Sequence, residues 1–314
     1  MGCGSMGVCH GEAYQKLENV QITAVVDIDR EKGQALAGRL GCSWAPNLAA
    51  LRFDKIDFVD ICLPTHLHFA AISQACRFTK NILCEKPLVI KEEEISGISL
   101  LIRQHDLRLM TAHVLRFWNC YDKIRDMVKN QTLGEVSSIG CTRRQKRPVW
   151  SASNWLYQSS LSGGLVYDLM IHDIDYVVWL LGVPKAVVGD IVHDNDQVPL
   201  HAKAQLRYEN CIVDLFASWG MPESFDFYAT MEVIGGKGMV FCDSAGAFTW
   251  TDHEGNRKVS LEETDPYAEE LRYFIDCCEQ NRYPDKSDIS SVLQSLKTAR
   301  AIDQAATTGS IIVL

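Results

Sequence analysis

Two side chains that can move protons are four residues apart in the apolar stretch GGLVYDLMIHDIDYVVWLLG. These are Asp168 and His172, and Asp175 follows three residues later, so a helix would place all three near one face. A buried carboxylate and imidazole need polar partners or a polar cleft, because leaving them unpaired is costly. The pattern indicates either a hydrogen bond inside a core or an acid/base pair. In the second case His172 is the natural base, since an imidazole titrates closest to neutrality.

Lys86 is a third candidate for proton transfer. It lies in the motif CEKP at the carboxyl end of a predicted strand, and the motif LPTHLH (63–68) ends the preceding strand. The carboxyl ends of parallel strands meet at one edge of a sheet, where such folds bind ligands. Alone, Glu-Lys-Pro is usually a surface turn. Together, a Lys, an Asp and a His that converge on one hydroxyl could remove its proton while a hydride leaves the adjacent carbon.

The chain begins with a glycine pattern that could hold the group accepting that hydride. MGCGSMG contains G-x-G-x-x-G, a helical stretch (8–17) follows it, and Asp27 comes 20 residues after the last glycine. Such glycines let the backbone approach a pyrophosphate, which the helix N-terminus favours. The candidate cofactor-binding residues of this loop are Gly2, Gly4, Ser5, Met6 and Gly7.

The carboxylate of Asp27 bears on the type of cofactor. It can accept the hydroxyl hydrogens of an adenosine ribose and would repel a 2′-phosphate, which favours NAD over NADP. Arg30 is close enough in sequence to leave NADP possible. The alternative interpretation is an ordinary strand–turn–helix corner with a surface aspartate.

The elements around these residues predict two domains. Strand-like runs alternate with helical patterns over residues 1–117, beginning with VQITAVVDID (20–29), and this alternation is typical of a doubly wound parallel sheet. Residues 118–314 begin with a helix (121–130) and the long apolar helix (163–182), followed by several strand-like runs without helices between them. They predict an α+β domain with a mostly antiparallel sheet, and the last helices could pack back on the first domain.

The strand that should precede the glycine loop is missing, because only Met1 stands before it. Such a strand would be central in the sheet, and without it two rows of backbone groups would be unpaired. We expect an upstream apolar extension of about six residues, a usual strand length. A start assigned too late or a trimmed chain explains the gap better than a natural truncation.

Bulk composition excludes several functions. The 314 residues carry a net charge of −9, which opposes general binding to nucleic acid, and the basic run TRRQKR (142–147) is expected to be a solvated rim. No apolar run is long enough to span a membrane, and no signal peptide is visible. The 12 cysteines lack metal-binding spacing. We therefore predict a cytoplasmic protein with reduced thiols and no metal.

At these motifs the chain resembles the Gfo/Idh/MocA oxidoreductases, the family of glucose-fructose oxidoreductase and inositol 2-dehydrogenase. The resemblance covers the glycine loop, Asp27, LPTHLH, CEKP, AHVLRFW (112–118), GGLVYDLMIHDID (163–175), EVIGGKG (232–238) and SLKTARAIDQAATTG (295–309). It implies a Rossmann-type NAD-binding domain and a substrate domain with a large open sheet that often builds homodimers or homotetramers.

The resemblance also implies roles for individual residues. Lys86, Asp168 and His172 would be the catalytic trio, with His172 as proton acceptor. The remaining candidate residues are Pro64, Thr65, His68 and Glu85 at the cofactor and Arg116, Trp155 and Tyr228 at the substrate. Where the family usually has Thr-Pro-Asn, this chain has Leu63-Pro64-Thr65, so the resemblance implies backbone contacts to the cofactor there and not the family's side-chain contacts.

The expected function is an NAD(P)-dependent dehydrogenase acting on a secondary hydroxyl of a polyol, a cyclitol such as inositol, or a sugar. One alternative is an NAD-dependent glycosidase of the same fold, which oxidises its substrate transiently and eliminates a leaving group. Another is a regulatory protein that binds a sugar or cofactor without turnover. The joint presence of the Lys, Asp and His argues against the regulatory protein, and the truncated start argues for it.

Overall fold

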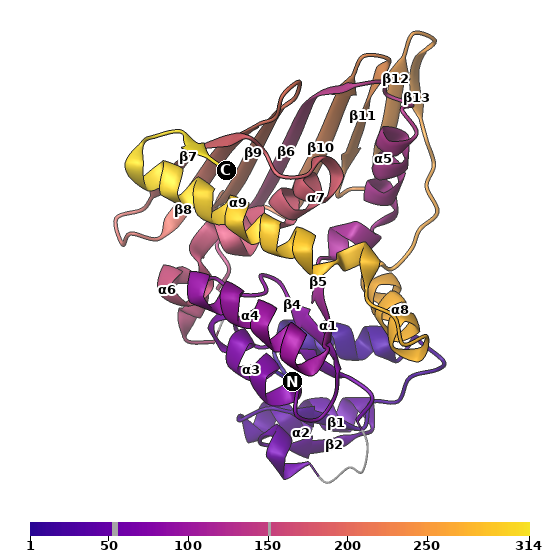
Figure 1. Cartoon of the computed structure of the whole chain (residues 1–314), viewed down its shortest axis with the longest axis vertical. Coiled ribbons are helices and arrows are strands. Elements are labelled where there is room, and N and C mark those ends of the chain that lie inside the picture. Colours follow the sequence, from indigo (N-terminus) through magenta and orange to yellow (C-terminus); the bar gives the residue numbers. More distant parts are fainter. Residues whose placement is uncertain (52–55, 150–151) are drawn as a thin grey trace. The chain divides into compact units, whose positions relative to one another are not determined.

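The computed structural model describes residues 1–51, 56–149 and 152–314, which form two compact units (Figure 1). The first unit contains residues 1–117 and 265–292, and the second contains residues 118–264 and 293–314. The chain therefore passes between the units at 117–118, 264–265 and 292–293.

The first unit is built on parallel strands with helices between them, as the alternating sequence pattern predicted. Its strands are β1 (Ala24–Val26), β2 (Ser43–Ala45), β3 (Val59–Ile61), β4 (Asn81–Glu85) and β5 (Arg108–Ala112). Its helices are α1 (Ser5–Tyr14), α2 (Arg30–Leu40), α3 (His68–Ala75), α4 (Glu92–His105) and α8 (Pro266–Glu279). In the described residues the sheet is in two pieces, β1–β2 and β3–β4–β5, and every pairing in them is parallel.

Local sequence sets the ends of these helices. The side chain of Asp29 caps α2 by accepting hydrogen bonds from the backbone N–H groups of Glu31 and Lys32, and Gly41 ends the helix with φ 68°. Asp265 caps α8 in the same way, and Pro266 occupies its first turn. The bounds of both helices therefore follow from residues that the sequence displays.

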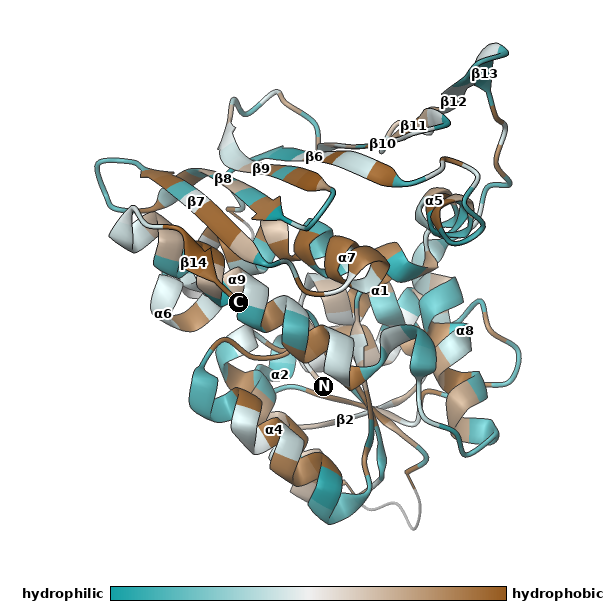
Figure 2. Ribbon diagram, turned by 45° about the horizontal axis from the view of Figure 1, so that its top comes forward, coloured by the Kyte–Doolittle hydropathy of each residue, from teal (hydrophilic) through white to brown (hydrophobic). Residues whose placement is uncertain are grey.

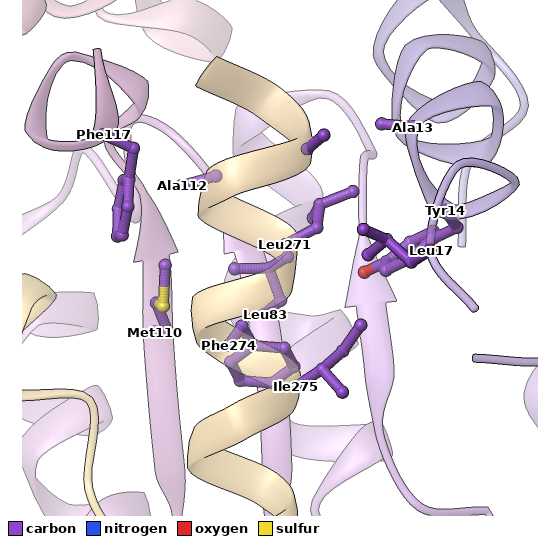
Figure 3. Close-up of a cluster of buried hydrophobic side chains, with 11 residues drawn as sticks. Ala13, Tyr14, Leu17, Leu83, Met110, Ala112, Phe117, Leu271, Phe274 and Ile275 are labelled. Atoms are coloured by element: carbon purple, nitrogen blue, oxygen red, sulfur yellow. The ribbon is translucent and has the colours of Figure 1, made fainter. Parts of the chain in front are cut away.

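Helix α8 completes the core of the first unit although Asp265, which caps it, comes 148 residues after Phe117 in the chain (265 − 117). Its apolar face, with Leu271 and Phe274 completely buried, packs on Leu83 of β4 and Met110 of β5 (Figure 3). Burying a large apolar side chain contributes about 1.5–3 kcal/mol, so this unit depends on α8 for much of its stability.

The second unit contains one sheet of nine strands in the order β13-β12-β11-β10-β6-β9-β8-β7-β14. The strands are β6 (Val136–Lys146), β7 (Ala186–His193), β8 (Pro199–Arg207), β9 (Ile212–Met221), β10 (Tyr228–Gly235), β11 (Gly238–Asp243), β12 (Phe248–Asp252), β13 (Gly255–Lys258) and β14 (Ile312–Val313). Only the β6–β9 pair is parallel among the described pairings. This confirms the predicted mostly antiparallel sheet.

Helices cover one face of this sheet. They are α5 (Asn119–Lys129), α7 (Ile171–Leu181) and α9 (Ile289–Thr308), and all three lie on the same side of the strands in Figure 2. The short α6 (Ser159–Ser162) precedes α7. Along β9 every second residue from Val213 to Trp219 is buried, as expected for a strand with one packed face.

Several predicted bounds were wrong. The run 20–29 forms a strand only over Ala24–Val26, and the helix expected over 8–17 is Ser5–Tyr14. The long helix 163–182 is a π-helical turn (Val166–Met170) followed by α7. The basic run is the end of β6, and its Arg143 is buried instead of solvated.

The carboxyl group of Asp303 on α9 makes the stability of the second unit depend on pH. Burial raises the pKa of Asp303 to about 7. In the unfolded chain this carboxyl group titrates near about 3.9. Between about pH 4 and pH 7 the folded protein therefore binds a proton that the unfolded chain does not. The free energy of unfolding consequently falls as the pH rises through this range. We expect Asp303→Asn to be more stable than the wild type at pH 8 by up to about 4 kcal/mol, but not at pH 4. Urea unfolding at both pH values checks this, and equal differences at the two would contradict it.

Composition led to two expectations, one about the state of the cysteines and one about membrane-spanning segments. All 12 cysteines are free thiols. Among the described residues, no helix combines the length and the apolar character that crossing a membrane requires.

Candidate functional site

The glycine loop lies at the carboxyl end of β1, where residues 1–2 enter helix α1. Gly2 has φ 91°, and a Cβ there would lie 2.5 Å from the carbonyl oxygen of Cys62. A Cβ on Gly7 would lie 1.9 Å from the carbonyl oxygen of Gly2. Both positions therefore require glycine, one for the turn and one for the close approach of α1 to it. Gly4 is different, because a Cβ added there would have no described protein atom within 4 Å.

Helix α1 begins beside this open space, and no side chain accepts a hydrogen bond from the backbone N–H groups of its first turn. Gly4 is its N-cap, no side chain caps the helix, and its first turn contains no acidic residue. The N-terminus of a helix carries a partial positive charge that attracts phosphate. The cradle at Gly4 and this helix end therefore fit a pyrophosphate, which supports the predicted roles of Gly2, Gly4 and Gly7.

Two alanine substitutions should separate these roles. We expect Gly4→Ala to weaken NAD binding about tenfold or more with little change in Tm, because its methyl group meets no described protein atom but enters the ligand space. Gly7→Ala should lower Tm as well, because its methyl group would overlap the Gly2 carbonyl. Titration of NAD and thermal unfolding of both variants measure the two effects. Equal losses of Tm would contradict the assignment of Gly4 to the ligand.

Asp27 holds the loop together through two hydrogen bonds from backbone N–H groups. Its Oδ2 accepts a hydrogen bond from the backbone N–H of Cys3 at 2.7 Å, and its Oδ1 accepts one from the backbone N–H of Asp29 at 2.8 Å. A carboxylate has about four acceptor positions, so ribose hydroxyls can still bind. The Asp27 side chain is partly exposed, and burial, followed by the nearby Asp27 charge, raises the pKa of the Cys3 thiol to about 11.

The loops after β3 and β4 are joined by His68. Its Nε2 lies 2.7 Å from the carbonyl oxygen of Leu63, and its Nδ1 lies 3.0 Å from that of Pro87. His68 is buried, and so is Thr65 in the short helix that follows Pro64. The His68 ring therefore links the two loops that border the predicted cofactor site, which favours a supporting role over a direct contact.

Lys86 and Glu85 face different surroundings. Lys86 is half-buried at the end of β4, whereas Glu85 is buried with its Oε1 3.1 Å from Nε2 of His10. The Oε2 of Glu85 accepts a hydrogen bond from the backbone N–H of Lys86 at 3.0 Å. Glu85 thus fixes the backbone that carries Lys86.

His10 lies at the centre of a buried polar cluster that the sequence analysis missed. Its Nδ1 is 2.8 Å from Oδ2 of Asp60, which also accepts a hydrogen bond from the Tyr14 hydroxyl at 3.0 Å. Burial would lower the pKa of His10, but Cys62 and Asp60 raise it well above its usual value. The raised pKa favours the imidazolium form, whose Nδ1 is hydrogen-bonded to Asp60 and whose Nε2 lies within ion-pair distance of Glu85. The signal in the sequence was a histidine three residues after the last glycine.

Asp168 and His172 belong to the second unit and lie where the helix geometry changes. Asp168 is in the π-helical turn and His172 is in the first turn of α7. Both are partly exposed, while Val166, Tyr167, Leu169, Met170 and Ile171 are buried. A π-turn inside a helix often marks a functional site. The structure therefore presents these two side chains from an otherwise apolar segment.

The other two aspartates of this segment have structural partners. Asp175 is buried and accepts a hydrogen bond at 3.0 Å from the hydroxyl of Ser295, so it is not with the partly exposed pair as the sequence suggested. Asp173 forms a buried bidentate ion pair with Arg143. Nε of Arg143 donates to Oδ2 of Asp173 at 3.1 Å, and Nη2 donates to Oδ1 at 2.7 Å. Such a fork-to-fork geometry is the strong form of this ion pair.

The three residues that the family resemblance suggested for the substrate, Arg116, Trp155 and Tyr228, lie in different surroundings. Arg116 is completely buried in the first unit, where its Nη1 donates to the carbonyl oxygen of Lys286 at 3.1 Å and to Oγ of Ser291 at 3.0 Å. Tyr228 begins β10 and its hydroxyl donates to Oδ2 of Asp243 at 3.0 Å. Trp155 is partly exposed in a short 3₁₀ helix (Ala152–Tyr157). The first of these positions favours a structural role.

The first unit combines a parallel sheet with a glycine turn, a helix N-terminus that no side chain caps, and an aspartate at the end of a strand. This combination is typical of the class of dinucleotide-binding proteins. Two family models match the chain accordingly. The model described as "Oxidoreductase family, NAD-binding Rossmann fold" matches residues 1–113, and "GFO/IDH/MocA C-terminal domain" matches residues 121–241. The chain belongs to this family of NAD-dependent oxidoreductases, which confirms the resemblance, the fold class and the NAD cofactor.

Named relatives act on sugars and polyols. Myo-inositol 2-dehydrogenase of Thermotoga maritima is 25% identical over 293 residues, which are 88% of this chain and 86% of the relative. The 2,7-anhydro-N-acetylneuraminate hydratase of Escherichia coli is 25% identical over 276 residues, or 84% and 67% of the two chains. Levoglucosan dehydrogenase, solved with NADH and levoglucosan, has the same fold, with TM-score 0.89, 20% identity and coverage of 99% and 97%.

Proposed function

We propose that this protein is a dehydrogenase that oxidises a secondary hydroxyl of a polyol, a cyclitol or a sugar with NAD. The observation that carries the proposal is the partial exposure of Asp168 and His172 in a helical segment whose other side chains around them are buried. Ionisable side chains that stay partly exposed in a helical segment with buried neighbours are typical of functional sites. The membership of the family and its dehydrogenase relatives supports the same class of reaction.

Oxidation of an alcohol requires the loss of a hydride from carbon and of a proton from oxygen. NAD, when bound, supplies the hydride acceptor. We assign the proton to His172, the hydrogen bond to the substrate oxygen to Lys86, and the orientation of the imidazole to Asp168. Glu85 and His10 are positioning residues. Glu85 accepts a hydrogen bond from the backbone N–H of Lys86, and His10 in turn contacts Glu85.

The carboxylate of Asp27 supports the preference for NAD. We expect Asp27→Asn to weaken NAD binding more than NADP binding, because an amide no longer repels a 2′-phosphate while one acceptor of the ribose hydroxyls is weakened. The change keeps the shape of the side chain but leaves one acceptor oxygen, so only one of the two hydrogen bonds from the backbone N–H groups of Cys3 and Asp29 can persist. Titration of the two cofactors measures the ratio, and a ratio unchanged from the wild type would contradict the ribose assignment.

A substrate panel tests the proposed activity. Cyclitols, polyols and sugars are offered with NAD or NADP, and the absorbance of the reduced cofactor is followed for the wild type and for Lys86→Ala. We expect turnover of at least one compound by the wild type and a loss of about 10²-fold or more in the variant. Absence of both turnover and NAD binding in the wild type would overturn the proposal.

A second candidate function follows from the hydratase among the relatives. A hydratase changes its substrate without net oxidation, and the same acid/base groups could support transient oxidation followed by elimination. Chromatography of anhydro-sugars and glycosides incubated with catalytic NAD distinguishes the two. Product formation without accumulation of NADH would favour this second function.

We also propose that the protein forms a homodimer or homotetramer through the face of the nine-stranded sheet opposite α5, α7 and α9 in Figure 2. Light scattering on the purified protein measures the mass directly, and a monomer at high micromolar concentration would contradict the proposal.

A further inference from the structure

Two cysteines from distant parts of the chain meet inside the second unit. Cys120 lies in the first turn of α5, and Cys242 lies in β11, 122 positions later in the chain (242 − 120). Both are buried and both are free thiols. The thiol of Cys242 donates a hydrogen bond to the sulfur atom of Cys120. The packing of α5 on the sheet therefore brings the two sulfur atoms into contact.

The strand register shows that this contact is selective. Strand β10 lies between β11 and β6, and its Met231 is opposite Cys242 on one side and Cys141 on the other. Cys141 and Cys242 are thus two strand spacings apart, or roughly 9.5 Å. A disulfide joins Cα atoms that are about 4.4–6.8 Å apart, so these two thiols cannot be linked without movement of the backbone. Only Cys120, which α5 adds from the helix-covered face, is in hydrogen-bond contact with Cys242 (Figure 2).

The surroundings of Cys120 favour its thiolate. No side chain caps α5, and the backbone N–H of Tyr121 in its first turn donates a hydrogen bond to the Cys120 sulfur. The positive end of the helix dipole adds to this stabilisation. The hydrogen bond from Cys242 lowers the pKa of Cys120, although burial and the charge of Asp243 oppose it.

Cys120 differs in this respect from every other cysteine of the chain. Each of the other 11 has a raised pKa, mainly because of burial, or for Cys242 because its proton is shared with Cys120. Cys120 is also the more accessible member of the pair, with 8% of its surface exposed against 1% for Cys242. A small oxidant therefore meets Cys120 first, and Cys242 holds the proton beside it.

We propose that Cys120 and Cys242 are a redox-active pair that a hydroperoxide converts into a reversible disulfide. The Cys120 thiolate attacks one peroxide oxygen, the O–O bond breaks, and the released hydroxide or alkoxide takes up a proton, which leaves a sulfenic acid on Cys120. The Cys242 sulfur then attacks the Cys120 sulfur. The S–S bond forms, the S–O bond breaks, and the hydroxyl group leaves with the thiol proton as water.

The two steps balance, because the two thiols lose two electrons and the hydroperoxide gains them. The product ties the first turn of α5 to β11 within the second unit. The inference does not depend on the proposed enzymatic function, since neither thiol belongs to the candidate site.

Oxidation of the intact protein tests this proposal. The protein is treated with an equimolar amount of hydrogen peroxide, the remaining thiols are blocked with N-ethylmaleimide, and protease fragments are analysed by mass spectrometry. We expect one cross-linked pair of fragments, containing Cys120 and Cys242, which dithiothreitol separates. We also expect Tm to rise by about 5 °C or more and to return on reduction, because a disulfide that closes a long loop restricts the unfolded chain.

Two variants make the test specific. Cys141→Ala removes a buried thiol of the same sheet and should keep both the cross-link and the shift in Tm. Cys242→Ser keeps a hydrogen-bond donor beside Cys120 but cannot form the disulfide. In this variant we expect dimedone, which traps sulfenic acids, to label Cys120 about tenfold faster than the partly exposed Cys9 and Cys76.

Three results would overturn the assignment. The first is a set of cross-links spread over other cysteines. The second is oxidation of Cys120 in the wild type to a sulfinic acid without a disulfide, which would show that the Cys242 sulfur does not reach it. The third is labelling of Cys120 in folded Cys242→Ser no faster than that of Cys9 and Cys76. If Cys242→Ser does not fold, the cross-links of the wild type and of Cys141→Ala decide alone.

Discussion

Replacement of His172 by alanine is expected to abolish alcohol oxidation while leaving NAD binding within about twofold of the wild type. A positioned general base contributes typically about 10²–10⁴-fold to the rate, so kcat should fall by that factor. NAD binding should persist, because the glycine loop and Asp27 belong to the first unit and His172 to the second. Steady-state rates with the best compound of the panel and titration of NAD measure the two quantities.

A matched histidine substitution controls for general damage to the second unit. His193 is exposed at the end of β7, and His193→Ala should leave both kcat and NAD binding unchanged. His172→Gln keeps the size of the side chain and should be as inactive as the alanine variant, since an amide cannot accept the proton. An active His172→Gln enzyme, or a His172→Ala protein with a greatly lowered Tm, would make the residue structural.

Substitution of Asp173 by asparagine is expected to destabilise the second unit by about 3–5 kcal/mol. Its carboxylate is the partner of the Arg143 guanidinium, and both are buried. Burial would lower the pKa of Arg143, but Asp173 and Tyr121 raise it above its usual value, so the guanidinium remains charged. Removal of one partner leaves an uncompensated buried charge, which costs far more than the pair contributed. Urea unfolding followed by tryptophan fluorescence measures the loss.

An exposed ion pair of the same unit provides the control. Lys185 and Glu209 are 3.0 Å apart and their side chains are 65% and 76% exposed. Glu209→Gln should change the free energy of unfolding by less than about 1 kcal/mol. A similar small effect for Asp173→Asn would mean that the guanidinium finds another partner or reaches water.

The features that the sequence predicted well are those that depend on neighbours along the chain. The glycine turn and the alternation of strands and helices are both local patterns. The consequence of the first in the structure is the close contact at Gly7. The antiparallel sheet followed in the same way from strand-like runs joined by short turns.

The features that the sequence did not predict depend on residues far apart in the chain. His10 meets Asp60 and Glu85, which are 50 and 75 positions away, and Arg143 meets Asp173 across 30 positions. Nothing in TRRQKR indicated that its first arginine is buried, because burial is decided by the partner on another element. The π-helical turn at Asp168 was equally hidden, since its residues fit an ordinary helical pattern.

The polar cluster at His10 contains one more group without a local explanation. Glu270 of α8 is completely buried, and burial raises its pKa well above the usual value, which favours the protonated form. Neither of its carboxyl oxygens has a hydrogen-bond partner among the described residues. The neighbouring apolar side chains Leu271 and Phe274 of α8 are buried in the core of the first unit (Figure 3).

The late position of α8 has a consequence for biosynthesis. Residues 1–117 leave the ribosome early, yet the helix that closes their core spans Pro266–Glu279. About 150 further residues must be translated before α8 is available, which takes roughly ten to thirty seconds at usual rates of synthesis. Until then Leu83 and Met110 are not covered by α8. During that interval the exposed apolar surface of the nascent first unit is a natural target for chaperones that act on growing chains.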